Sequence, residues 1–355
     1  MKRILSIDGG GIRGIVPATI LVALEKKIQT LTGNGAARLS DFFDFFAGTS
    51  TGGILTSILL CPDENDPTKS KYSAEDALNL YKNFGNQIFH SNIWQKITTL
   101  GGLADELYNA TPLENILEEY FANIRLANLK KPCIITAYDV ERRSAFIFSQ
   151  EDATHRQGYD FYLKDVCRAT SAAPTYFELA TIKSLTGVTY NLIDGGVFAN
   201  NPALCAYTEN KEIINPDTQK GYSTKDLFFV SLGTDVKRSE GYNAKKMKNW
   251  GALTWAKPLI DIMMAGVNDT TDFHLRSLFK AAQVPYQYHR LEANAVNNIR
   301  QINESQMDDA SEENIEKLIE FGTEMAQSLD YRLNFIAECV IEPAKIIEKT
   351  SIATF

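Results

Sequence analysis

Residues 42–60 read FFDFFAGTSTGGILTSILL, and this stretch decides the fold class. The apolar run at 42–47 predicts a buried strand. Helical spacing follows at Ile54, Leu55, Ile58 and Leu59. Between the two lies a sharp turn, Gly48-Thr49-Ser50-Thr51-Gly52, in which glycines flank a central serine. A strand that passes through such a turn into a helix is typical of an α/β protein that presents a nucleophile at the end of a strand.

The rest of the chain repeats this alternation. A strand at 4–7 precedes an amphipathic helix at 16–31, and a long helical pattern covers 311–337. Further strands are expected at 133–138, 145–149, 190–193, 228–232 and 286–291. Strands separated by helices predict a mainly parallel sheet covered on both faces. Without an internal repeat or a clear linker, residues 1–355 are expected to form one domain, with the catalytic motifs within 4–202 and a helical C-terminal part at 245–355.

Composition limits the class of protein and its surroundings. Of the 355 residues, 44% are hydrophobic and 23% are charged, which excludes a disordered chain. The net charge of −8 argues against a nucleic acid polymer as partner. The five cysteines form no CxxC pair, and no apolar run reaches the ~18 residues of a spanning helix. We therefore expect a cytoplasmic protein with reduced cysteines, whose contact with a membrane is peripheral.

The first candidate motif follows the first strand and reads Asp8-Gly9-Gly10-Gly11-Ile12-Arg13-Gly14. Glycines let backbone N–H groups converge on an anion, so this loop is a candidate anion site. A dinucleotide-binding fold uses the same GxGxxG spacing at Gly9, Gly11 and Gly14. That fold would place a carboxylate at the end of the second strand, where this chain has Ala47-Gly48-Thr49-Ser50. The dinucleotide interpretation is therefore disfavoured.

Two further motifs supply reactive side chains. In the turn at residues 48–52, Ser50 would project its hydroxyl from the sheet as a nucleophile, the alternative being a plain strand-to-helix turn. Asp194-Gly195-Gly196 follows the strand at 190–193, where active sites of α/β proteins form, although an Asp-Gly turn alone would give the same letters. We expect all three motifs at the same edge of the sheet, at the ends of parallel strands. An anion cradle, a nucleophile and a base are the groups that acyl transfer requires.

These motifs and several segments outside them resemble the patatin family of lipid acyl hydrolases. The additional segments are ATSAAPTYF at 169–177, Asn200-Asn201-Pro202 after the DGG motif, and VSLGT at 230–234. The resemblance extends from Ile4 to about Leu329. It implies a three-layer α/β/α fold with a mainly parallel central sheet, related to α/β-hydrolases and cytosolic phospholipase A2.

The resemblance also implies roles for single residues. Ser50 and Asp194 would form a catalytic dyad, and the backbone around Gly10 and Gly11 would form the oxyanion hole. Arg13 would shape that loop or offset charge. The implied substrates are phospholipids and other glycerolipids, cleaved at a carboxylic ester without a metal or an organic cofactor. The alternative is a triad completed by His274 or His289, but both lie within predicted helix or strand rather than on a loop at a strand end.

Two segments are candidates for contact with lipid. Basic residues surround Trp250 and Trp255, as in membrane-docking patches. They are Lys237, Arg238, Lys245, Lys246, Lys248 and Lys257. Buried tryptophans beside a solvated lysine face would give the same pattern. The apolar residues of 88–103 could form a lid over an acyl pocket or a core helix.

Three functions fit these features. The first is a phospholipase A or esterase that acts on membrane or micellar lipid, and the second is a lipid-binding protein without turnover. The third is a bacterial membrane-degrading effector whose activity requires a cyclic dinucleotide activator. The sequence fixes neither the oligomeric state nor the position of the ester that is cleaved.

Overall fold

The computed structural model describes residues 1–88, 109–236, 244–248, 250–295 and 309–345, apart from the side chains of residues 246, 252, 253, 256, 257 and 295. Its main sheet contains the strands β1 (Lys2–Ile7), β2 (Phe45–Thr49), β3 (Cys133–Asp139), β4 (Ser144–Ser149), β5 (Ala180–Lys183), β6 (Thr189–Asp194), β9 (Leu227–Leu232) and β10 (Tyr288–Leu291). The strand order is β10-β9-β1-β2-β3-β6-β5, and β4 also pairs with β3. A separate hairpin pairs β7 (Ile214–Asn215) with β8 (Lys220–Gly221).

Parallel pairing dominates the centre of the sheet. β10, β9, β1, β2 and β3 are joined by parallel ladders, which confirms the expected mainly parallel central sheet. β4 and β6 run antiparallel to β3, and β5 runs antiparallel to β6. The expectation that all three motifs follow parallel strands is therefore wrong for Asp194, which ends the antiparallel β6.

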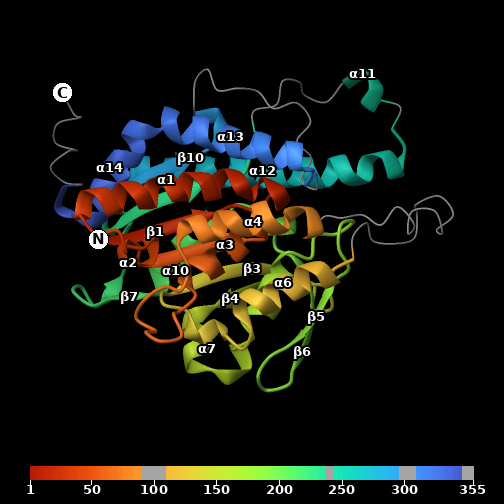
Figure 1. The fold of residues 1–355 in the computed structure, drawn as a ribbon, viewed down its shortest axis with the longest axis horizontal. Coiled ribbons are helices and arrows are strands. Elements are labelled where there is room, and N and C mark those ends of the chain that lie inside the picture. The colour runs from red at the N-terminus through yellow and green to blue at the C-terminus, as the bar shows by residue number, and fades with distance from the viewer. Residues whose placement is uncertain (89–108, 237–243, 249, 296–308, 346–355) are drawn as a thin grey trace.

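Helices cover both faces of the sheet (Figure 1). They are α1 (Ile15–Thr32), α2 (Leu39–Phe42), α3 (Thr51–Leu60), α4 (Ala74–Ile88), α6 (Thr111–Phe121), α7 (Gln150–His155), α8 (Leu163–Thr170), α9 (Gly196–Ala199), α10 (Ala203–Glu212), α11 (Ala244–Met247), α12 (Ala252–Ala281), α13 (Glu312–Ser328) and α14 (Asp330–Ile341). Adjacent strand residues point to opposite faces. Leu5 of β1 accordingly joins a core cluster with α1, α3, α4 and α13, whereas Ile4 joins a second cluster with α10 and the end of α12.

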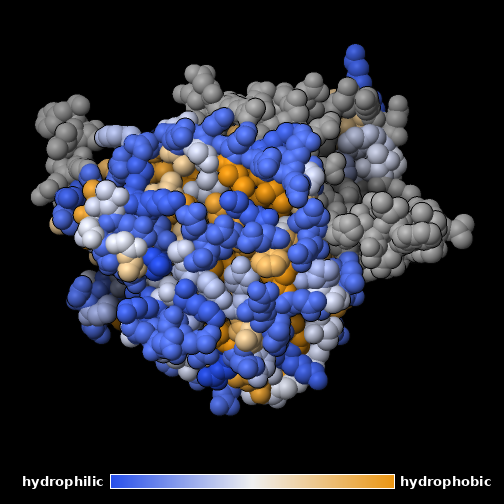
Figure 2. Space-filling model, viewed as in Figure 1, coloured by the Kyte–Doolittle hydropathy of each residue, from blue (hydrophilic) through white to orange (hydrophobic). Residues whose placement is uncertain are grey.

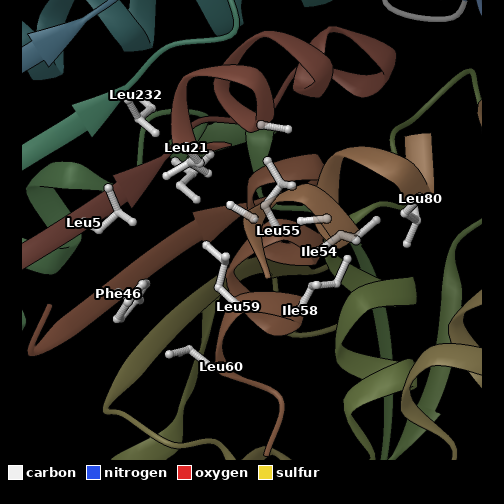
Figure 3. Close-up of a cluster of buried hydrophobic side chains, with 14 of the residues drawn as sticks. Leu5, Leu21, Phe46, Ile54, Leu55, Ile58, Leu59, Leu60, Leu80 and Leu232 are labelled. Atoms are coloured by element: carbon white, nitrogen blue, oxygen red, sulfur yellow. The ribbon is translucent and has the colours of Figure 1, made fainter. Parts of the chain in front are cut away.

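The larger of these cores supports the turn at the end of β2. In Figure 3, side chains of α3 lie between those of the strands and Leu80 of α4. Every residue of α3 is buried, which explains why its sequence contains no charged residue. On the outside, Figure 2 shows a mainly hydrophilic face with smaller hydrophobic areas between the helices.

Two element boundaries differ from the expected ones. The strand expected at 42–47 begins only at Phe45, because Phe42 still ends the short helix α2. The single helix expected at 311–337 is two helices, since the buried Leu329 leaves the helical conformation between α13 and α14. Both helices pack on α1, and the break lets each apply its own apolar face to it. Within the described residues, no helix has the length and apolarity needed to cross a bilayer.

Candidate active site

Ser50 occupies the turn between β2 and α3 in a conformation that is unusual for a serine. Its φ of 54° is positive, and non-glycine residues held in this region are strained. The turn is tight because Gly52 passes close to β1: a Cβ atom added there would lie 2.1 Å from the carbonyl oxygen of Ile7. The strand-to-helix turn at residues 48–52 thus has the geometry of a nucleophile elbow.

Threonines hold the elbow in place. The backbone N–H of Ser50 donates to the hydroxyl of Thr170 at 2.8 Å, and that hydroxyl donates to the carbonyl of Thr136 at 2.6 Å. The hydroxyl of Thr49 donates to the carbonyl of Ala199 at 2.6 Å. These groups are buried, so each hydrogen bond also satisfies a group that water cannot reach. The position of the nucleophile is therefore fixed by α8 and β3 as well as by its own strand.

The helix after the elbow is tied to α4 through Thr51. The hydroxyl of Tyr81 donates to the carbonyl of Thr51 at 3.1 Å and also contacts the Thr51 hydroxyl. Gly14 packs against the same threonine, since an added Cβ atom would lie 2.2 Å from its Oγ1. The glycine-rich loop and the elbow are thereby in direct contact.

Asp194 reaches the same edge of the sheet from an antiparallel strand. Its partner on β3 is Ala137, whereas the last residue of β2, Thr49, pairs with Thr136. β3 therefore extends past the end of β2, and β6 runs back along that extension until it ends beside the elbow. The three motifs meet as expected, although by a different topology.

Burial dominates the electrostatics of Asp194. The side chain is only 1% exposed, and the Gly196 N–H donates to Oδ1 at 2.6 Å. Burial raises the pKa of Asp194 to about 7, while the Ser50 hydroxyl and the Gly196 N–H oppose the rise. No contact of Oδ2 meets the distance and angle of a hydrogen bond among the described residues. Hydrogen bonds between catalytic groups are often long or poorly aligned in a site that holds no substrate.

The glycine-rich loop is held through the peptide groups of Gly9. The Gly9 N–H donates to the carbonyl of Asn200 at 3.0 Å, and the Gly9 carbonyl accepts from the Asn200 side chain at 3.2 Å and from the Thr234 hydroxyl at 2.5 Å. Gly11 follows with a φ of 58°, which turns the chain back towards the elbow. The N–H groups of Gly10 and Gly11 find no acceptor in the described part of the chain, so they are available to an anion.

Arg13 and Gly195 make close contacts with residues next to the reactive groups. The Arg13 side chain is buried, its Nε donates to the carbonyl of Gly10 at 3.4 Å, and its Nη2 lies 4.0 Å from Oδ1 of Asp261 on α12. Gly195 packs on Thr136, because an added Cβ atom would lie 2.1 Å from its hydroxyl oxygen. Arg13 thus contacts the loop through Gly10 and α12 through Asp261.

A narrow cavity of about 50 Å³ joins the reactive groups. Gly10, Gly11, Ser50, Thr51 and Asp194 line it together. The rest of its wall consists of Ile54, Leu80, Tyr81, Ile88, Leu113, Ser171, Ala173, Tyr176, Phe177 and Met264. This wall is mostly apolar, which suits a hydrocarbon chain and desolvates the carboxyl group. Ile88 starts the segment considered as a lid, and residues 89–103 of that segment lie outside the described residues.

None of the three histidines in the described residues lines this cavity. His155 is exposed on α7, and His274 is exposed on α12. His289 is buried in β10 between Phe228 and Phe335, and burial lowers its pKa to about 3. The fourth, His90, lies outside the described residues. The two histidines considered for a triad therefore do not line the cavity.

A buried ion pair supports the start of the glycine-rich loop. The guanidinium of Arg290 on β10 donates to both carboxylate oxygens of Asp8, at 2.6 and 3.0 Å, and to the Ser231 hydroxyl at 2.9 Å. Burial alone would lower the pKa of Arg290, but the Asp8 carboxylate raises it, so the guanidinium stays charged. This pair anchors the residue that precedes Gly9.

The reactive groups stand out in the sequence, whereas the residues that position them do not. Asn200 and Thr234 lie in segments noted for their resemblance to a family and received no role. Thr170 also lies in such a segment, and only its 2.8 Å contact with the Ser50 N–H reveals its use. No sequence pattern indicated a role for Arg290. It lies 282 positions after Asp8, and no local pattern pairs two residues that far apart.

Comparison with known proteins agrees with this arrangement. A family model described as patatin-like phospholipase matches residues 5–207. Patatin-like protein 2 of Oryza sativa is 34% identical over 342 residues, covering 91% of this chain and 83% of its own length. Patatin-like protein 1 of Arabidopsis thaliana is 35% identical, covering 97% and 85%, and Patatin-2-Kuras 3 of Solanum tuberosum is 31% identical, covering 92% and 83%.

Among solved structures, VipD from Legionella pneumophila aligns with a TM-score of 0.34 at 12% identity, over 93% of this chain and 67% of that chain. The family match and the relatives confirm the resemblance seen in the sequence, and the parallel-centred α/β sheet is the fold that it implied. The chain belongs to the patatin-like phospholipase family of lipid acyl hydrolases.

Proposed function

We propose that this protein is a serine hydrolase that cleaves carboxylic esters of phospholipids and other glycerolipids through a Ser50–Asp194 dyad. One observation carries the proposal. A serine on a strained elbow and a buried carboxyl group line the same apolar cavity, in which the described residues place no histidine. The alternatives of a histidine-containing triad and of a lipid-binding protein without turnover leave this pairing unexplained.

The reaction would proceed in two half-reactions. The Asp194 carboxylate takes the proton of the Ser50 hydroxyl as Oγ bonds to the ester carbonyl carbon. The resulting oxyanion would face the N–H groups of Gly10 and Gly11, which have no acceptor among the described residues. The intermediate then expels the alcohol, which takes the proton from Asp194. Water attacks the acyl-enzyme with Asp194 again as base, releasing the fatty acid and restoring Ser50.

The environment of Asp194 makes a carboxylate an effective base. A carboxyl group with its ordinary pKa near ~4 is a weak base for a serine hydroxyl at neutral pH. With its pKa raised to about 7 by burial, Asp194 holds a proton more strongly and is still ionised in a large fraction of molecules at neutral pH. The apolar wall of the cavity therefore serves both substrate binding and catalysis.

The test is product analysis by mass spectrometry on mixed phospholipids. Wild type is expected to release free fatty acid and lysolipid, and Ser50→Ala to release neither. Ser144→Ala, which alters an exposed serine on β4, is the matched control and should retain wild-type turnover. Hydrolysis that persists in Ser50→Ala would overturn the proposal.

Two further arms separate the alternatives. His274→Ala and His289→Ala should both retain activity, and loss of activity in a folded variant would support a triad. Wild-type activity should also be independent of added cyclic dinucleotide. An enzyme that is silent until the nucleotide is added would support a signal-activated effector instead.

A further inference from the structure

The N-terminal half of α12 exposes an apolar stripe. Leu259, Ile262 and Met263 are 46%, 37% and 49% exposed, and helical spacing places them on one side of the helix. The half-buried Trp255 lies one turn earlier on the same side, and its ring packs edge-on against Trp250 at 5.2 Å. In Figure 1 this half of α12 extends past the end of α13 towards α11.

Charge is nearly absent from this half of the helix. Between Ala252 and Asn268 the sequence contains two charged residues, Lys257 and Asp261. The exposed residues whose side chains are described there are all uncharged: Thr254, Leu259, Ile262, Met263, Ala265 and Gly266. The following half exposes the charged residues Asp269, Arg276 and Lys280 as well as the apolar Phe273 and Leu278. In a chain with a net charge of −8, a half-helix whose described exposed side chains are all uncharged indicates a surface that meets an apolar partner.

The opposite side of the same half-helix forms part of the active site. Met264 lines the cavity beside Ser50 and Asp194. The side chain of Asn268 accepts a hydrogen bond of 3.0 Å from Asn200, which also holds the glycine-rich loop. The same half-helix therefore carries the exposed apolar stripe on one side and a residue of the cavity wall on the other.

Charge at the start of the stripe identifies the partner. Lys245 and Lys248 are exposed just before Trp250, while the side chains of Lys246 and Lys257 are not described, and Lys237 and Arg238 lie outside the described residues. Apolar side chains flanked by tryptophan and lysine match a bilayer interface, in which the rings lie at headgroup level and the ammonium groups meet phosphates.

We propose that the N-terminal half of α12 is the surface by which this protein docks on a phospholipid bilayer. Leu259, Ile262 and Met263 enter the acyl boundary, and the exposed lysines contact anionic headgroups. Docking in this way brings the helix that carries the cavity residue Met264 against the lipid. This inference rests on the proposed function, because the bilayer on which the protein docks would hold the substrate of the proposed hydrolase.

The experiment measures binding without hydrolysis, in the full chain carrying Ser50→Ala. Vesicles of phosphatidylcholine, alone or mixed with phosphatidylglycerol, are sedimented with the protein. Ile262→Ser/Met263→Ser should weaken binding about ten-fold or more, since two apolar side chains no longer leave water. The matched control is Leu31→Ser/Ile214→Ser, which alters apolar residues that are 51% and 58% exposed on α1 and β7. It should bind as the parent does.

Charge provides a second readout. Lys245→Glu/Lys248→Glu should weaken binding to the mixed vesicles and leave binding to pure phosphatidylcholine nearly unchanged. Equal vesicle binding by the stripe variant and the parent would overturn the proposal. So would a wild-type dimer, in sedimentation velocity, that Ile262→Ser/Met263→Ser converts to monomer, because a second copy of the chain would then cover the stripe.

A soluble short-chain ester separates this inference from the proposed function. With Ser50 intact, the stripe variant should hydrolyse that ester at the wild-type rate and lose activity only on vesicles. If wild type fails to hydrolyse the ester but Ser50→Ala still binds vesicles through α12, the proposed function fails and the docking surface stands.

Discussion

The protonation of Asp194 sets the pH range of the proposed reaction. Because burial raises its pKa to about 7, the carboxyl group is protonated in acid and cannot accept the Ser50 proton. We expect kcat/KM on a soluble ester to fall about ten-fold per pH unit below about pH 7 and to level off above it. A profile whose acidic limb lies near pH 4 would contradict the raised pKa of Asp194.

The same burial predicts that Asp194 destabilises the fold. The folded state retains a proton between about pH 4 and 7 that the unfolded state releases, so stability falls as pH rises through this window. Asp194→Asn removes this cost while keeping an acceptor for the Gly196 N–H. Urea denaturation should show a gain of up to about 4 kcal/mol at pH 8 and a smaller gain at pH 5. An equal gain in stability for Asp194→Asn at pH 5 and at pH 8 would contradict the raised pKa.

Residues that carry chemistry could be predicted from sequence, whereas residues that hold them could not. Ser50 and Asp194 are flanked by glycines at expected strand ends, so local patterns suffice to propose them. Thr170 acts through one hydroxyl that links Ser50 to Thr136, residues that lie 120 and 34 positions away. Contacts of this kind depend on which strands become neighbours, and a local pattern does not contain that information.

The close packing of β1 against α3 at the elbow leads to a testable prediction. A Cβ atom in Gly52→Ala would lie 2.1 Å from the carbonyl of Ile7, and a backbone atom cannot move aside as a flexible side chain can. α3 would have to shift, so we expect a loss of about 3 kcal/mol in stability and a large loss of turnover. Gly35→Ala, where nothing lies within 4 Å of the added atom, is the control. Wild-type urea midpoints for both variants would contradict the tight packing.

The direction of the strands at one side of the sheet is the part of the fold that the sequence did not predict. The alternation of strands and helices correctly predicts the parallel centre, because a helix between two strands carries the chain back to the starting edge. No long amphipathic helix separates β5 from β6, so this part of the chain forms an antiparallel pair. Asp194 still reaches Ser50, because β6 pairs only with the part of β3 that extends past β2.

The pair formed by Asp8 and Arg290 connects the start of the chain with its C-terminal part. It joins the end of β1, across β9, to the late strand β10, and both side chains are fully buried. A carboxylate left alone in this position would have neither water nor a counter-ion. The region 245–355, which the sequence describes as helical, therefore also contributes a strand and a charge on which the glycine-rich loop depends.

Replacing Arg290 alone should therefore lower the free energy of unfolding more than replacing both Arg290 and Asp8. We expect Arg290→Met to lose about 3–5 kcal/mol, because Asp8 is then buried without its partner. Asp8→Asn in the same chain should recover part of that loss, since a neutral amide is cheaper to bury than a carboxylate. Urea denaturation of the wild type, both single variants and the double variant measures the coupling. Additive losses would contradict it, because the two side chains would then contribute independently although they lie 2.6 Å apart.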